Sequence, residues 1–142
     1  MTEGIKRWID RLSEPRREFG DIPSCPYAKG CRWAVYRTNS FWYGIQEGFR
    51  MFSSECFDVL IYACKIDTLS SDDASSIAHD YGDIGITVLV SDPRRPTIVF
   101  GYQTTQDQEL LFIFQWTNDL YKARSILDAL GYYRGLPQQG QQ

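Results

Sequence analysis

Residues 86–116 carry three apolar runs, ITVLV at 86–90, TIVFGY at 97–102 and LLFIFQW at 110–116. Each run is rich in β-branched or aromatic residues, and a short polar segment separates it from the next, which is the pattern of strands joined by turns. The runs predict a three-stranded antiparallel meander. Because this is the densest hydrophobic part of the chain, the remaining elements are expected to pack on it or beside it.

The segment upstream of these runs predicts two strands with a helix between them. Residues 32–38 alternate as a short strand, 41–54 carry apolar side chains at helical spacing, and 57–66 form a nearly continuous apolar run. Such a run is typical of a central strand that is covered on both faces. The three segments together predict a βαβ unit with parallel strands. Within the helix, Gly44 and Gly48 lie one turn apart and indicate close packing on the sheet.

Three further helices are predicted from their spacing and end signals. Apolar residues recur at helical spacing over 3–13, between Ser70 and Gly82, and between Thr117 and Gly131. Hydroxyl side chains favour the start of the second and third of these helices, and the glycines favour their ends.

These elements predict a single α+β domain over residues 1–134. Its mixed sheet is expected to have about five strands, including the antiparallel meander, with helices packed on its faces. The tail at 135–142 is too polar to pack and is expected to be disordered. The predicted core consists of Trp33, Val35, Phe49, Val59, Ile61, Ile77, Val88, Val90, Val99, Phe112, Phe114 and Leu127.

Composition narrows the classes of function. The 142 residues carry a net charge of −3, so the chain lacks the positive field of a nucleic-acid-binding protein or of a protein attracted to anionic membranes. No apolar run approaches the roughly 18 residues of a membrane-spanning helix, and residues 1–7 show no signal-peptide pattern. We therefore expect a cytoplasmic protein. No phosphate-binding loop or metalloprotease motif is present, and no cofactor is predicted.

Cys25 is the candidate nucleophile. It precedes a segment that favours a short helical turn, where unpaired backbone N–H groups stabilise a thiolate, and Lys29 would add to that effect. Cys31 would be the resolving thiol of a redox enzyme. The alternative is that both are structural loop cysteines, kept reduced in the cytosol.

The segment Cys-Pro-Tyr-Ala-Lys at 25–29 resembles a Cys-Pro-Phe-Ala-Lys segment in a family of small uncharacterised bacterial proteins. In that family the segment also follows an N-terminal helix and precedes a strand, and Tyr27 stands here in place of its phenylalanine. The likeness covers five residues and implies no activity.

Two other clusters of polar residues are candidates for ligand binding. His79, Asp80 and Asp83 lie at a predicted helix end and could act as a base or as ligands, or could be a solvated helix terminus. Arg94 and Arg95 lie at a hairpin tip between two prolines and could bind a phosphate or carboxylate, or could be a solvated turn. The four cysteines and His79 lack the ligand spacing of structural zinc, so no metal site is predicted.

Three hypotheses for function remain open on this reasoning. The first is a non-catalytic binding or interaction protein, expected to form a homodimer. It rests on Phe41-Trp42-Tyr43, a cluster too large for one helix face, which leaves Trp42 or Tyr43 for a partner. The second is a small thiol enzyme that uses Cys25, and the third is a small-ligand or metal-binding protein that uses His79.

Overall fold

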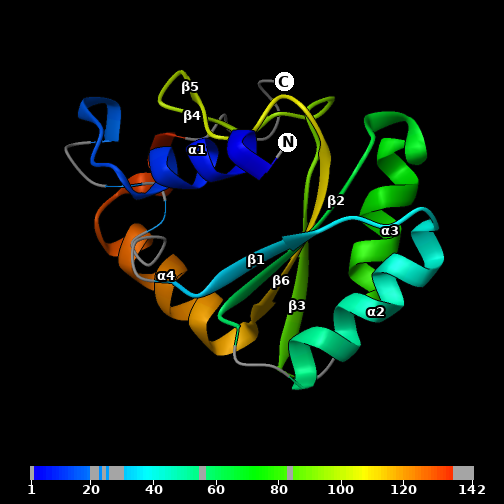
Figure 1. Ribbon diagram of the computed structural model, residues 1–142. Coiled ribbons are helices and arrows are strands. Elements are labelled where there is room, and N and C mark those ends of the chain that lie inside the picture. Colours follow the sequence, from blue (N-terminus) through cyan, green and yellow to red (C-terminus); the bar gives the residue numbers. More distant parts are fainter. Residues whose placement is uncertain are drawn as a thin grey trace.

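The computed structural model describes residues 2–19, 23, 25, 31–54, 57–82 and 85–135. Over these residues the chain folds as an α+β domain, which confirms the predicted fold class (Figure 1). The elements in chain order are α1 (Thr2–Ser13), η1 (Arg17–Phe19), β1 (Trp33–Tyr36), α2 (Phe41–Ser54), β2 (Val59–Cys64), η2 (Ile66–Thr68), α3 (Ser71–Tyr81), β3 (Ile86–Ser91), β4 (Ile98–Val99), β5 (Tyr102–Gln103), β6 (Leu110–Trp116), α4 (Thr117–Ala129) and η3 (Tyr132–Gly135).

The main sheet has four strands in the order β1-β2-β6-β3. Strands β1 and β2 are parallel, with Val35 beside Ile61, and α2 connects them. The predicted βαβ unit is therefore confirmed. The other two pairs are antiparallel, and β2 and β6 fill the two central positions.

The predicted meander is wrong in its middle strand. Strands β3 and β6 pair directly, with Val88 beside Phe114, and β4 and β5 form a separate two-stranded hairpin. The apolar run at 97–102 is interrupted by Phe100 and Gly101, whose φ angles are +48° and +80°. Two successive positive φ angles produce the tight turn of a two-residue hairpin, so this run folds back on itself.

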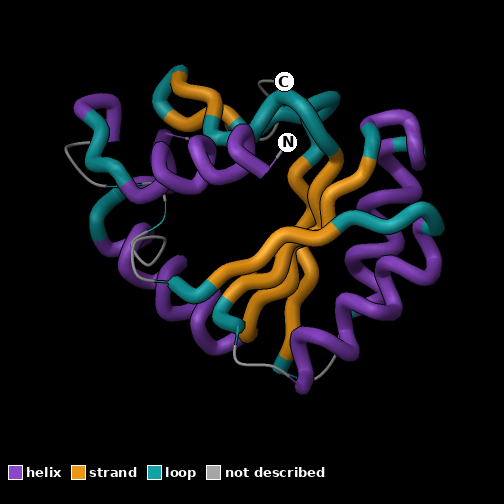
Figure 2. Tube along the Cα trace, viewed as in Figure 1, coloured by secondary structure: helices purple, strands orange, loops and turns teal. Residues whose placement is uncertain are grey.

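The two faces of the sheet are covered differently (Figure 2). Helices α2 and α3 pack on one face, where a cluster that includes Ile45, Phe52, Tyr62, Phe112 and Phe114 is almost fully buried. Helix α1 covers part of the other face, through a smaller cluster of Ile5, Trp8, Ile9, Ile61, Ala63 and Leu111. Helix α4 is on the same side as α1 but does not share its cluster.

The glycine pair of α2 allows the close packing that the sequence predicts. Gly44 and Gly48 are both buried. A Cβ atom at Gly48 would lie 2.6 Å from Cζ of Phe114, and one at Gly44 would clash with the ring of Tyr62. Tyr36 stacks on Tyr62 with 4.9 Å between ring centroids, and its hydroxyl donates to the carbonyl oxygen of Gly44 at 2.6 Å. The helix backbone thus lies directly on the aromatic surface of the sheet.

The predicted core is confirmed in half of its members. Ile61, Val88, Val99, Phe112, Phe114 and Leu127 are buried, whereas the other predicted residues are half-buried: Trp33, Val35, Phe49, Val59, Ile77 and Val90. The helical spacing between Thr117 and Gly131 also predicts an inward-facing stripe of α4 that consists of Leu120, Ala123, Leu127 and Leu130, and this is wrong at Leu130, which is 54% exposed. Leu120 and Ala123 of that stripe are also only half-buried.

No helix among the described residues is long and apolar enough to cross a membrane. Several sequence predictions fall outside the described residues: the helical turn at 26–30 with Lys29, Asp83, and the polar tail beyond Gly135.

Candidate ligand-binding cavity

A cavity of about 740 Å³ lies between α1, α4 and the face of the main sheet that α2 and α3 leave free. Figure 1 shows the three elements around this space, with α4 running from the end of β6 toward η1. The cavity is partly open to solvent, and apolar side chains form most of its lining.

The sheet supplies the floor of the cavity. Successive side chains of a strand point to opposite faces, so alternate residues of each strand reach this side. Phe112 and Phe114 of β6 point into the cluster under α2. The residues that alternate with them, Ile113 and Gln115, line the cavity. We define the cavity floor as Trp33, Val59, Ile61, Leu89, Ile113 and Gln115.

Helices α1 and α4 form the walls. Trp8, Ile9 and Leu12 line the cavity from α1, and Leu120, Ala123 and Leu127 line it from α4. The indole Nε1 of Trp8 donates to the carbonyl oxygen of Thr104 at 2.7 Å, which ties α1 to the segment after β5. Packed helices therefore form the apolar part of the walls, and Thr97, Thr104 and Thr105, which flank the β4–β5 hairpin, also line the cavity.

The cavity stays open because α4 is anchored away from the sheet. Its one buried residue, Leu127, packs with Phe19, Val99 and Tyr132, which belong to η1, β4 and η3. The helix starts directly after β6 and ends on this third cluster. It therefore spans the free face of the sheet at a distance, and Leu120 and Ala123 remain half-buried on its inner side.

Apolar surface dominates the cavity lining, and one of its polar groups, the side-chain amide oxygen of Gln115, is unsatisfied among the described residues. Oε1 of Gln115 is buried and has no hydrogen-bond partner in the part of the chain that the structure describes. Asp58, by contrast, accepts from the backbone N–H of Arg32 at 2.7 Å and forms an ion pair with its guanidinium at 3.5 Å. The backbone hydrogen bond from Arg32 is the main cause that holds the pKa of Asp58 below its ordinary value.

Cys25 and Cys31 both line the cavity, so the structure brings the two predicted thiols to one site. Both are half-buried and in no disulfide bond, and the backbone N–H of Cys25 donates to the carbonyl oxygen of Leu12 at 2.9 Å. Burial, with smaller contributions from Cys25, Asp58 and Asp119, raises the pKa of Cys31 to about 11. Cys31 is therefore a neutral thiol near neutral pH, which is the less reactive form.

The other predicted site residues lie away from the cavity. His79 and Asp80 are at the end of α3, and their side chains are 90% and 76% exposed. Arg94 forms an ion pair with Asp92 at 3.0 Å, and Arg95 forms one with Asp72. Both arginines thus have partners within the chain. Over the described ranges, no group of three or more potential metal ligands is found.

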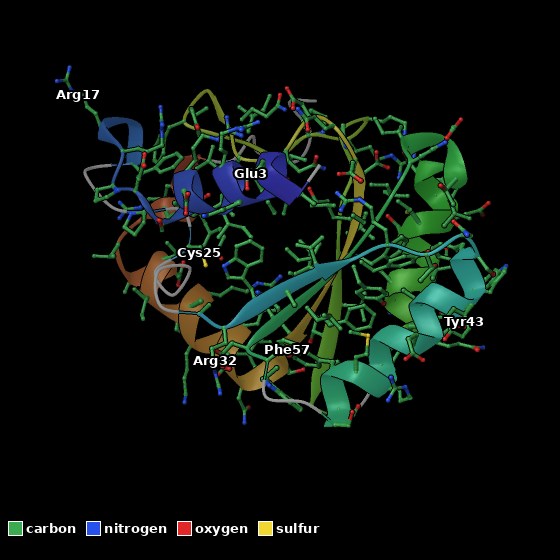
Figure 3. All side chains as sticks on the ribbon, in the orientation of Figure 1. Glu3, Arg17, Cys25, Arg32, Tyr43 and Phe57 are labelled. Carbon is green, nitrogen blue, oxygen red and sulfur yellow. The ribbon has the colours of Figure 1, made fainter. Side chains whose placement is uncertain are left out.

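Trp42 and Tyr43 are exposed on α2, on the side of the sheet opposite the cavity. Their exposed fractions are 55% and 60%, and Figure 3 shows Tyr43 pointing outward from the helix. Phe41, in contrast, packs edge-on against Trp42 and also contacts Phe112 in the core. The helix cannot bury all three rings, as the sequence predicts.

Sequence reasoning missed most of the cavity. Helical spacing predicts that Trp8, Leu12, Leu120 and Ala123 face a packed core, and the run LLFIFQW predicts only that Gln115 belongs to a strand. Gln115 carried a usable signal, because it is a polar residue at a position of the run LLFIFQW that alternates with buried phenylalanines.

The chain matches no protein-family model, and no curated protein or solved structure matches it significantly.

Proposed function

We propose that this protein is a non-catalytic binding protein that holds a small, mainly apolar molecule in the cavity. The observation that carries the proposal is the cavity itself. Its volume of about 740 Å³ falls within the range of small-molecule sites, roughly 300–1,000 Å³. Such sites are lined mainly by apolar and aromatic side chains with a few polar groups, which describes this lining.

The burial of the lining supports a ligand site over a packing defect. Trp33 lies on the edge strand β1 and Val59 on the central strand β2, and both remain half-buried because they face the cavity. Leaving large apolar side chains partly in water is unfavourable by about 25 cal/mol per Å² of apolar surface. A ligand that covers the cavity floor recovers this free energy.

A thiol-dependent activity is the second candidate, since Cys25 and Cys31 line one site. The raised pKa of Cys31 weakens it, because thiol–disulfide exchange proceeds through the thiolate. Neither cysteine forms a disulfide bond, which is the state expected of thiols in a reducing compartment.

The proposal is tested by filling the cavity. Ala123 lines it from α4, whereas Ala129 is exposed on the same helix and lies outside the lining. We expect N-phenyl-1-naphthylamine to bind the wild type with enhanced fluorescence, Ala123→Trp to abolish that binding, and Ala129→Trp to leave it unchanged. Circular dichroism checks that both variants fold. Absence of binding to the wild type, or equal binding to both folded variants, would refute the proposal.

A further inference from the structure

Gln115 is the polar member of an otherwise apolar cavity floor. It lies on β6 between Val59 of β2 and Thr87 of β3, and Ile113 precedes it on the same face. The Thr87 hydroxyl forms a hydrogen bond with the Thr117 hydroxyl at 2.8 Å. The amide oxygen of Gln115 is buried and unpartnered among the described residues.

A buried carbonyl oxygen without a donor is unfavourable, and most such groups in proteins have a partner. The rest of the Gln115 side chain is only half-buried and lines the cavity. Rotation about the terminal torsion of glutamine is soft, so the oxygen can turn toward the cavity. The missing donor is then one that an occupant of the cavity supplies.

The charges around the cavity indicate a neutral occupant. Among the described residues, the charged side chains of the lining are Asp58, Asp119, Lys122 and Arg124. Asp58 is paired with Arg32, and Asp119, Lys122 and Arg124 are exposed on α4. Each of these charges is therefore either paired or in contact with solvent, and none is left buried for a charged occupant to neutralise.

We infer that the ligand class is a neutral molecule with an apolar, ring-sized body that carries one hydrogen-bond donor, such as a hydroxyl or N–H group, and that Gln115 accepts from that donor. This inference rests on the proposed binding function. It makes Gln115 a specificity-determining residue: the apolar body binds to the floor and walls, and the donor selects among molecules of the same shape. A site with a polar group of this kind rejects an analogue that leaves the group unpaired.

The test uses three ligands of nearly equal shape. 2-Naphthol has a donor, 2-methylnaphthalene has a methyl group in its place, and 2-methoxynaphthalene has an acceptor without a donor. We expect the wild type to bind 2-naphthol about three- to tenfold more tightly than 2-methylnaphthalene, the range set by one net hydrogen bond. Dissociation constants come from quenching of tryptophan fluorescence, since Trp8 and Trp33 line the cavity.

The variant Gln115→Met keeps the length of the side chain and removes the acceptor. We expect it to equalise the affinities for the three ligands and to leave the melting temperature unchanged or higher, because it removes an unpartnered buried group. Gln46→Met is the matched control, since Gln46 is exposed on α2 on the other side of the sheet. It should retain the wild-type preference.

The outcomes separate this inference from the proposed function. Equal affinity of the wild type for all three ligands, or a preference that survives in Gln115→Met, would overturn the role of Gln115 and leave the binding function standing. Failure of the wild type to bind any of the three would overturn both.

Discussion

The close packing of α2 on the sheet can be tested by adding one methyl group. In Gly48→Ala the new Cβ would lie 2.6 and 2.8 Å from two ring carbons of Phe114 and would also clash with the hydroxyl of Tyr36. Phe114 is fully buried, so its ring has no free space to move into. Overpacking of this kind destabilises a protein by about 1–3 kcal/mol.

Alanine also favours the helix, by up to about 1 kcal/mol relative to glycine, and this offsets part of the loss. Subtracting this gain from the overpacking cost leaves a net destabilisation of up to about 2 kcal/mol, or up to roughly 8 °C in melting temperature for a chain of this length. Thermal and urea unfolding followed by circular dichroism measure both quantities.

Gly4→Ala is the matched control, because Gly4 is in α1 and a Cβ there meets only the end of the exposed Gln108 side chain, at 2.6 Å. That side chain can move away, so we expect this variant to be as stable as the wild type or up to about 1 kcal/mol more stable. If Gly48→Ala behaves like Gly4→Ala, then α2 does not lie on the sheet as closely as described, and the argument from the glycine pair is wrong.

Three further predictions concern separate parts of the chain. Alkylation of Cys31 by iodoacetamide should be slow at about pH 7 and should accelerate about tenfold per pH unit toward its raised pKa of about 11. Mass-spectrometric mapping measures the rate, and equally fast labelling of Cys31 in the folded and the urea-unfolded protein would contradict this prediction. Light scattering should give about twice the monomer mass of 16.4 kDa, and Trp42→Ala should weaken the association because exposed tryptophans are frequent interface anchors. A wild type that stays monomeric at high concentration removes the basis for a dimer. Ser70→Ala should lower the free energy of unfolding by about 1 kcal/mol in urea titrations, since the Ser70 hydroxyl accepts from the backbone N–H of Asp73 at 3.1 Å at the start of α3. An unchanged free energy of unfolding would mean that this cap contributes nothing to stability.

The parts of the fold that the sequence predicts well are those with strong local signals. Helix α2 has the predicted bounds, and β2 is the central strand that its continuous apolar run indicates. Gly131 has the positive φ angle, +82°, expected of a helix exit. In each case the residues that decide the structure are neighbours in the chain.

The wrong predictions concern segments whose structure depends on contacts with distant parts of the chain, which the local sequence pattern does not show. The run TIVFGY has the composition of one strand, and nothing in that composition shows that Phe100 would adopt a left-handed conformation. Phe100 donates its backbone N–H to the carbonyl oxygen of Gly135 at 2.9 Å, a contact 35 positions away in the chain that holds the turn in place. Without β4 between them, β3 and β6 are free to pair.

The cavity was unpredictable for a related reason. The apolar stripe of α4 has the same spacing whether the helix packs on a sheet or spans a hollow. What decides between the two is the anchoring of Leu127 on Phe19 and Tyr132, which come from opposite ends of the chain. Sequence periodicity reports which residues avoid water, but it does not report how far away the opposite surface lies.

The unequal packing of the two sheet faces has a practical consequence. The face under α2 and α3 supplies most of the buried core. The molecule can therefore remain folded while the cavity on the other face is empty. An occupant that binds only the folded chain then adds its binding free energy to stability, about 2.7 kcal/mol at a free concentration one hundred times its dissociation constant. The melting temperature of the protein can therefore be used to find its ligand. Fractions of a cell extract that raise the melting temperature contain a molecule that binds the folded chain, and the other fractions can be discarded.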